Sequence, residues 1–199
     1  MEYKLFDTPH SHDEAFYRNR EAADHIHQRD HKPRLLAVLE ELKAIVTDED
    51  SICDFGCGNG GLIREVERLM DNRIWGYDLS PKNVEDAHRN ESLNVKLIDF
   101  VNDPAIEYPD IAICTETIEH LVDPDGFLQK LKTKGVKKAI FSTPGYETID
   151  FHAPFHLWVW TDDSFKEVFT RNGWTVDKFY LHDHPDYGHR GFQIVVAHI

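Results

Sequence analysis

The chain has 199 residues, of which 41% are hydrophobic and 29% charged, and its formal net charge is −14. This length suits one folded domain with a substantial core, and the acidic balance disfavours nucleic acid, whose phosphates are bound by Lys and Arg. No apolar run is long enough to span a membrane and no signal peptide opens the chain. We therefore expect a cytoplasmic protein whose three cysteines, Cys53, Cys57 and Cys114, are reduced.

The first 46 residues are predicted to form a helical cap, and residues 47–199 a sheet-containing catalytic part, all within one domain spanning residues 1–199. A first helix is expected over residues 14–28 and is ended by Lys32-Pro33. Apolar residues at helical spacing then predict a second helix over residues 35–46, with Pro33 in its first turn.

From residue 51 onward, short apolar runs alternate with helical patterns. Strands are expected at residues 51–55, 73–78, 95–100, 111–114 and 139–142, which implies a parallel sheet with helices on both faces. After a helix at residues 162–172, two late strands at 176–181 and 192–199 are typical of a closing antiparallel hairpin. The predicted fold class is α/β: a doubly wound, Rossmann-like, seven-stranded, mostly parallel sheet.

A glycine-rich turn, Gly56-Cys57-Gly58-Asn59-Gly60, joins the first strand to the next helix. Glycine permits positive φ and a close ligand approach, and a helix N-terminus offers unpaired N–H groups. Three acids, Asp54, Asp78 and Asp99, follow or end successive strands, and ligands of such sheets bind at the carboxyl ends of the strands. Asp78, about twenty residues beyond the turn, is placed to accept both hydroxyls of a ribose.

The motif Asp-x-Gly-x-Gly-x-Gly resembles the cofactor motif of class I S-adenosylmethionine (SAM) methyltransferases, and the resemblance covers roughly residues 35–199. It implies SAM as the cofactor, with Asp54 at its amino-acid end. Leu79 and Phe100 would lie beside the adenine, and Asp99 would accept a hydrogen bond from the adenine amino group. The full predicted cofactor set is Asp54, Gly56, Cys57, Gly58, Gly60, Asp78, Leu79, Asp99, Phe100 and Glu116. Tyr17 and Arg18 in the cap could reach the cofactor carboxylate, or serve only in packing. A nicotinamide-dependent oxidoreductase is disfavoured by the glycine spacing and by the lack of a Tyr-x-x-x-Lys pair.

A second cluster of chemistry-bearing residues, Glu116-Thr117-Ile118-Glu119-His120, follows the fourth strand. If this segment is helical, Glu116, Glu119 and His120 share one face, and two carboxylates with an imidazole suit a divalent metal. A histidine-rich segment at residues 151–161, after the fifth strand, is expected at the same edge of the sheet.

This pattern is similar to that of small-RNA 3′-end 2′-O-methyltransferases, and its Glu-x-x-Glu-His segment to ubiquinone-pathway O-methyltransferases. The resemblance implies Mg²⁺ or Mn²⁺ held by Glu116, Glu119, His120 and His156, gripping two neighbouring oxygens of the acceptor. In metal-free relatives, Glu119 and His120 instead shape the site or orient the acceptor. The candidate catalytic residues are then Glu119, His120 and His152, with His152 as the base.

The expected function is SAM-dependent O-methylation of a small polar acceptor, assisted by a divalent metal. Three alternatives stay open: a metal-independent N- or C-methyltransferase of a small molecule, an RNA 3′-end 2′-O-methyltransferase, and a non-catalytic SAM-binding protein. The chain lacks the basic tract expected of an RNA enzyme. The expected partner is therefore a small-molecule acceptor, with neither a nucleic acid nor a membrane.

Overall fold

The computed structural model describes residues 2–4, 31–91, 93–184, 186 and 188–199. The helix expected over residues 14–28, with Tyr17 and Arg18, lies outside these residues. None of the described helices is both long enough and apolar enough to cross a membrane.

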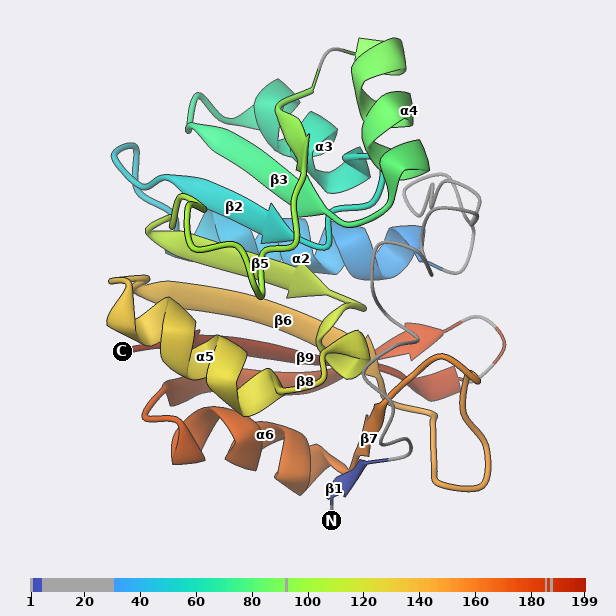
Figure 1. Ribbon diagram of the computed structural model, residues 1–199. Helices are drawn as coiled ribbons and strands as arrows, with labels where there is room; N and C mark the ends of the chain where they lie inside the picture. Colours follow the sequence, from blue (N-terminus) through green and yellow to red (C-terminus); the bar gives the residue numbers. More distant parts are fainter. Residues whose placement is uncertain (1, 5–30, 92, 185, 187) are drawn as a thin grey trace.

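A seven-stranded sheet forms the centre of the molecule (Figure 1). Its strands are β2 (Ile52–Phe55), β3 (Ile74–Asp78), β4 (Val95–Leu97), β5 (Ile111–Thr115), β6 (Lys138–Pro144), β8 (Thr175–His184) and β9 (Gly188–His198). They lie in the order β4-β3-β2-β5-β6-β9-β8, parallel from β4 to β6, with β9 antiparallel to both β6 and β8. The predicted fold class, including the closing hairpin, is confirmed. Because the chain builds outward from β2 in both directions, a switch point lies between β2 and β5, where ligands of such folds bind.

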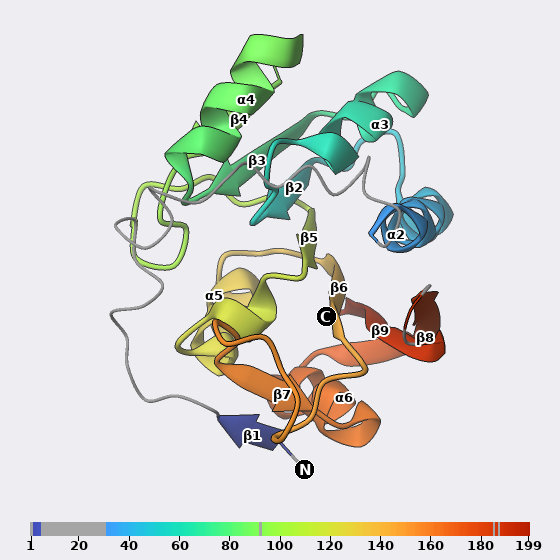
Figure 2. The ribbon, with the colours of Figure 1, turned by 90° about the vertical axis from the view of Figure 1, so that its right-hand side faces the viewer.

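Helices cover both faces of the sheet (Figures 1 and 2). Helices α2 (Lys32–Ile45), α3 (Gly61–Leu69) and α4 (Pro81–Glu91) pack on one face, and α5 (Pro124–Thr133) and α6 (Asp162–Arg171) on the other. In α2, Leu35, Val38, Leu39 and Leu42 form the buried stripe, at the spacing of one helix face. The described part of the predicted cap thus covers a sheet face, and its first turn reaches the ligand cavity.

Several elements differ from the sequence expectations. The strand expected at residues 95–100 ends at Leu97, and the hairpin strands extend to His184 and back from Gly188. A strand pair that was not expected joins β1 (Glu2–Lys4) to β7 (Trp158–Trp160), antiparallel and outside the main sheet. The segment after β5 forms only a short 3₁₀ helix, η2 (Ile118–His120), instead of an α-helix that includes residue 116.

Candidate active site

A cavity of about 790 Å³ lies at the carboxyl ends of β2, β3, β5 and β6, within the size range of small-molecule sites. Its lining includes most of the predicted cofactor residues: Asp54, Gly56, Cys57, Gly58, Asp78, Leu79, Asp99, Phe100 and Glu116. Glu119, His120 and His156 line it as well, so the structure brings the cofactor motif and the acid–histidine segments to one cavity. Gly60 and His152 are not among the described residues that line it.

The glycine turn keeps backbone close to the cavity and free of side chains. Gly56 has φ +80°, and a Cβ there would lie 2.1 Å from the Thr117 hydroxyl, so no larger residue fits. The amides of Gly56 and Cys57 both donate to the carbonyl of Tyr77, at 2.8 and 3.1 Å. Gly60, also at φ +80°, is the N-cap of α3, and a Cβ there would meet Leu93 at 2.6 Å. Its positive φ favours glycine at this place whatever the neighbouring side chains do.

Asp78 at the end of β3 ties the glycine turn to the start of α4. Its Oδ2 accepts from the Gly58 amide at 2.8 Å, and its Oδ1 accepts from the Ser80 amide at 2.8 Å and from Asn83 Nδ2 at 3.0 Å. Burial raises the pKa of Asp78, and these N–H donors oppose that rise. The carboxylate is thus held in one orientation at the cavity wall, as the predicted ribose contact requires.

Asp54 is a buried acid whose Oδ1 has no hydrogen-bond partner, although the residue lines the cavity. Burial raises the pKa of Asp54 to about 7, an effect that the charge of Arg34 opposes and that of Asp78 strengthens. A cationic group entering the cavity would supply the missing partner.

S-adenosylhomocysteine (SAH) is SAM without its transferable methyl group and keeps the amino-acid end that Asp54 is expected to contact. Its affinity is therefore expected to rise with pH between about pH 5.5 and 7. Asp54 is largely protonated at the lower limit, and a ligand ammonium prefers the ionised carboxylate, so the ligand has to displace a proton. We expect up to roughly tenfold tighter binding per pH unit below the pKa. Calorimetry on the wild type and on Asp54→Asn, which does not ionise, checks this: an equal slope in both would assign the pH dependence to another group, Asp78 first.

Asp99 and Phe100 line the cavity but are also engaged elsewhere. Asp99 accepts from the amides of Val101 and Asn102 at 3.1 and 3.2 Å, and from Asn102 Nδ2 at 2.8 Å. The Phe100 ring is 6% exposed and packs edge-on against Phe55, at 5.4 Å between ring centroids. Their adenine contacts stay predictions.

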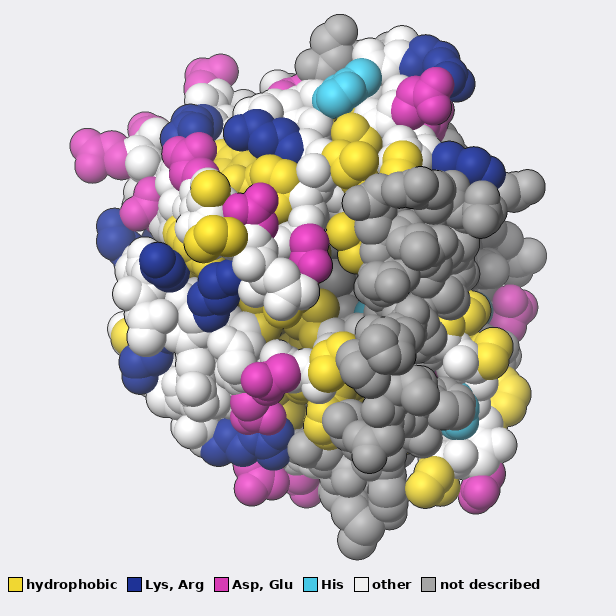
Figure 3. All heavy atoms as spheres, in the orientation of Figure 1, with side chains coloured by type: hydrophobic (Ala, Val, Ile, Leu, Met, Phe, Trp, Pro, Cys, Tyr) yellow, Lys and Arg dark blue, Asp and Glu magenta, His cyan; other side chains and the backbone are white. Residues whose placement is uncertain are grey.

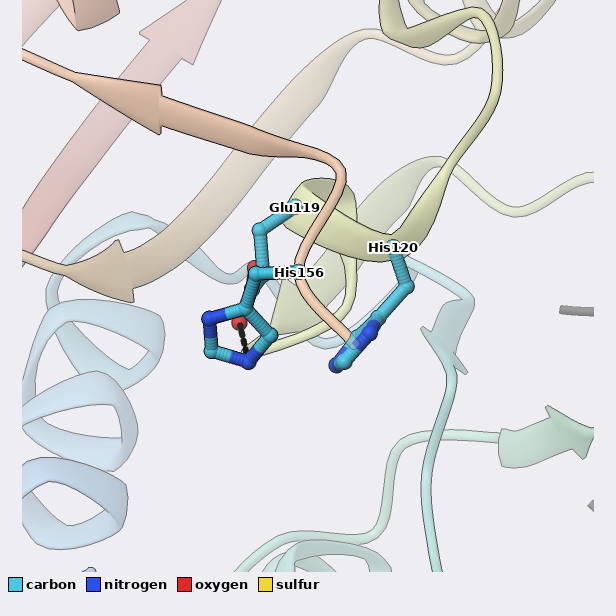
Figure 4. Close-up of side chains that lie close together, drawn as sticks. All are labelled: Glu119, His120 and His156. Atoms are coloured by element: carbon cyan, nitrogen blue, oxygen red, sulfur yellow. Dashed lines mark ion pairs between the residues drawn. The ribbon is translucent and has the colours of Figure 1, made fainter. Parts of the chain in front are cut away.

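Three residues of the acid–histidine segments converge: Glu119, His120 and His156 (Figure 4). One possible ligand atom from each lies within 4.8 Å of the others, and Glu119 Oε1 is 4.0 Å from His156 Nε2. Glu119 is fully buried; its Oε2 accepts from Thr143 Oγ1 at 3.2 Å, but its Oε1 has no hydrogen-bond partner. Burial raises the pKa of Glu119 well above its usual range, and Glu116 raises it further. Oε1 of Glu119 is therefore a buried polar atom without a hydrogen-bond partner that lies beside two imidazoles.

Glu116, the fourth residue of the predicted ligand set, is not in the group of three whose ligand atoms lie within 4.8 Å of one another. Its carboxylate is 3.2 Å from Nη1 of Arg34 and accepts from Ser142 Oγ at 3.1 Å. The shared helix face that the spacing predicts does not form, because Glu116 has φ +50° and η2 begins only at Ile118. Arg34 is fully buried and needs a counter-charge, which Glu116 provides.

Glu147 is a site residue that sequence reasoning missed. Its Oε2 lies 2.6 Å from His156 Nδ1, and both side chains are less than a tenth exposed. Glu147 stands nine residues before His156 in an irregular segment, where no periodic pattern links the two. Only the folded loop brings them together.

The sheet order and the acid-and-glycine turn define a class I SAM-dependent methyltransferase. The family model for the methyltransferase domain matches residues 25–178, and the chain belongs to that family. It is an enzyme that uses SAM.

Similar proteins act on different acceptors. Over 62 residues the chain is 34% identical to the ribosomal protein L11 methyltransferase of Paraburkholderia phytofirmans. This matched stretch is 31% of this chain and only 21% of that relative. The magnesium protoporphyrin IX methyltransferase of Synechocystis PCC 6803, solved with bound SAH, superposes with a TM-score of 0.67 at 18% identity, over 84% of this chain and 83% of that one. The methyltransferase domain of a bacterial Hen1 superposes with a TM-score of 0.64 at 24% identity, over 84% of this chain and 98% of that one. These structural likenesses support the fold alone.

Proposed function

We propose that the protein O-methylates a small polar acceptor bearing two adjacent oxygens, assisted by a divalent metal bound by Glu119, His120 and His156. The observation that carries the proposal is the buried Oε1 of Glu119, which has no hydrogen-bond partner and lies 4.0 Å from His156 Nε2. Burying a carboxylate without a partner is unfavourable, so a cation at this point would stabilise the site. The three residues therefore fit a metal.

The donor set favours Mn²⁺ or Co²⁺ over Mg²⁺. Two imidazoles and one carboxylate suit transition metals, whereas Mg²⁺ prefers oxygen ligands. His120 Nδ1 lies 3.1 Å from the Phe155 carbonyl oxygen, which only accepts, so we assign the proton to Nδ1 and the lone pair to Nε2.

Methyl transfer needs the acceptor oxygen in line with the donor methyl group, which SAM supplies as an electrophile on its sulfonium sulfur. Asp54 would hold the amino-acid end of the cofactor and Asp78 its ribose, and the glycine turn would let the cofactor lie against the backbone. A bound divalent metal would lower the pKa of the acceptor hydroxyl. The residues of the 145–157 segment that line the cavity, Tyr146, Ala153, Phe155 and His156, would form the acceptor wall.

The metal-free alternative has less support in the structure. His152, its candidate base, is not among the described residues that line the cavity. An RNA acceptor is disfavoured by the net charge of −14. On the face drawn in Figure 3, the Lys and Arg side chains of the described residues are interspersed with Asp and Glu and form no continuous basic patch.

Metal removal tests the proposal. The assay follows methyl transfer from labelled SAM to two acceptors: catechol, as a vicinal-diol probe, and a 3′-terminal ribonucleotide. Protein dialysed against EDTA is expected to lose at least 99% of its activity. Adding Mn²⁺ or Co²⁺ should restore more activity than adding Mg²⁺. If turnover is undiminished in EDTA, the metal role is wrong. Activity on the ribonucleotide alone would restore the RNA alternative.

A further inference from the structure

The carboxylate of Glu147 is held by two N–H donors, one on each oxygen. Its side chain is 3% exposed; Oε2 faces His156 Nδ1 at 2.6 Å, and Oε1 accepts from the Ala153 amide at 2.9 Å. A carboxylate is an acceptor only, so the proton in the short contact with His156 is assigned to Nδ1. The imidazole lone pair then lies on Nε2, the nitrogen 4.0 Å from Glu119 Oε1.

Backbone contacts fix this arrangement. Thr148 and Phe151 exchange two hydrogen bonds, of 2.8 and 3.1 Å, which fold the chain after Glu147 into a tight turn. The turn brings the Ala153 amide back to Glu147, and the His156 amide donates in turn to the Ala153 carbonyl at 3.1 Å. The Ala153 N–H is therefore a donor whose direction is set by the main chain and not by a side-chain rotamer.

We propose that Glu147 is a positioning residue that fixes the tautomer of His156, with the proton on Nδ1 and the lone pair of Nε2 directed at Oε1 of Glu119. The tautomer assignment stands on the metal-free geometry; its consequence for metal binding rests on the proposed function. Carboxylates that orient ligating imidazoles in this way contribute about 10- to 100-fold to metal affinity.

Only a carboxylate satisfies both donors. Glutamine has the same shape but one oxygen and one NH₂ group. Since the Ala153 N–H cannot turn away, the amide oxygen of a glutamine would accept from it, and the NH₂ group would then face His156 Nδ1. That contact is favourable only if Nδ1 accepts, which moves the imidazole proton to Nε2 and removes the lone pair from the site. Alanine offers His156 Nδ1 neither a carboxylate oxygen nor an NH₂ group, so both tautomers of the imidazole become accessible.

The tautomer is measured on the metal-free full-length protein with ¹⁵N-labelled histidine. At about pH 8.5, where an ordinary imidazole is neutral, the ¹⁵N chemical shifts identify the protonated nitrogen. His156→Asn assigns the signals. We expect the proton on Nδ1 in the wild type, on Nε2 in Glu147→Gln, and a mixture in Glu147→Ala. A proton on Nε2 in the wild type, or no change in Glu147→Gln, would overturn the proposal.

Calorimetric titration of the same proteins with Mn²⁺ supplies the second measurement. The expected order of affinity is wild type, then Glu147→Ala, then Glu147→Gln, with Glu147→Gln weaker than the wild type by roughly 10- to 100-fold. A residue that merely closes the loop would give the opposite order, because glutamine preserves the shape better than alanine. Glu40→Gln, on an exposed helix position, is the matched control. If the wild type binds no Mn²⁺ but the tautomer shifts as described, the metal proposal fails and the positioning role stands.

Discussion

Replacing Asp78 by Ala is expected to weaken SAH binding by roughly 100-fold or more. The carboxylate is expected to accept from two ribose hydroxyls, and hydrogen bonds to a charged group are each worth about 1.5–3 kcal/mol. It also holds the Gly58 amide at 2.8 Å, so its removal loosens the glycine turn that the cofactor lies against. Calorimetry with SAH measures the loss directly, and no knowledge of the acceptor is needed.

Asp99→Asn is the companion to this change. Asp99 also follows a strand and lines the cavity, and its oxygens, like those of Asp78, already accept from N–H groups of the protein. An asparagine oxygen can still accept one hydrogen bond from the adenine amino group. We expect SAH affinity to change by less than about fivefold, the size of a single modest hydrogen bond. Equal losses in the two variants would mean that the charge of Asp99 contributes as much to SAH binding as the carboxylate of Asp78. If Asp78→Ala kept wild-type affinity, the ribose assignment would be wrong.

The grouping of the predicted cofactor residues around one cavity follows from signals that are local in the sequence. A strand, a glycine turn and a helix follow one another within twenty residues, and the turn needs glycine for reasons visible in the backbone: Gly56 has positive φ and no room for a Cβ. The acid at the end of β3 is also placed by strand geometry, since parallel strands end at one edge of the sheet. The sheet order follows the same alternation of strands and helices.

The sequence motif picks out the acids and histidines that line the cavity, but it does not predict which of them converge. Spacing at i, i+3 and i+4 assumes a helix, and the chain instead leaves β5 with Glu116 at φ +50°. Glu116 forms an ion pair with Arg34, which lies 82 positions earlier in the sequence. No local pattern announces that a buried guanidinium will need a counter-ion.

The segment between β6 and β7 held the least predictable contacts. Glu147 reaches His156 only because a turn at residues 148–151 doubles the chain back, and turns of this kind leave no periodic signal. The β1–β7 pair likewise joins two short segments that lie far apart in the sequence, residues 2–4 and 158–160. Long-range pairing of short segments depends on the whole fold.

Glu119→Gln is expected to weaken Mn²⁺ binding by more than about 100-fold, because a direct ligand contributes more than an orienting neighbour. The melting temperature of the metal-free protein should stay level or rise. Thr143 can still donate to the amide oxygen, and the substitution removes a buried acid whose ionised form burial already disfavours. Calorimetry with Mn²⁺ and a thermal melt in EDTA, done on one preparation, measure both effects.

Glu116→Gln should give the reverse pattern and so separates the two acids of the Glu-x-x-Glu-His segment. It leaves Arg34, which is fully buried, without its counter-charge, a change that typically costs about 3–5 kcal/mol. For a chain of this length we expect the melting temperature to fall by roughly 6 °C or more. Mn²⁺ affinity should fall by less than about fivefold, because Glu116 is held outside the converging three. Equal loss of Mn²⁺ binding in both variants would place Glu116 in the ligand set, and would mean that Arg34 releases it when the metal binds.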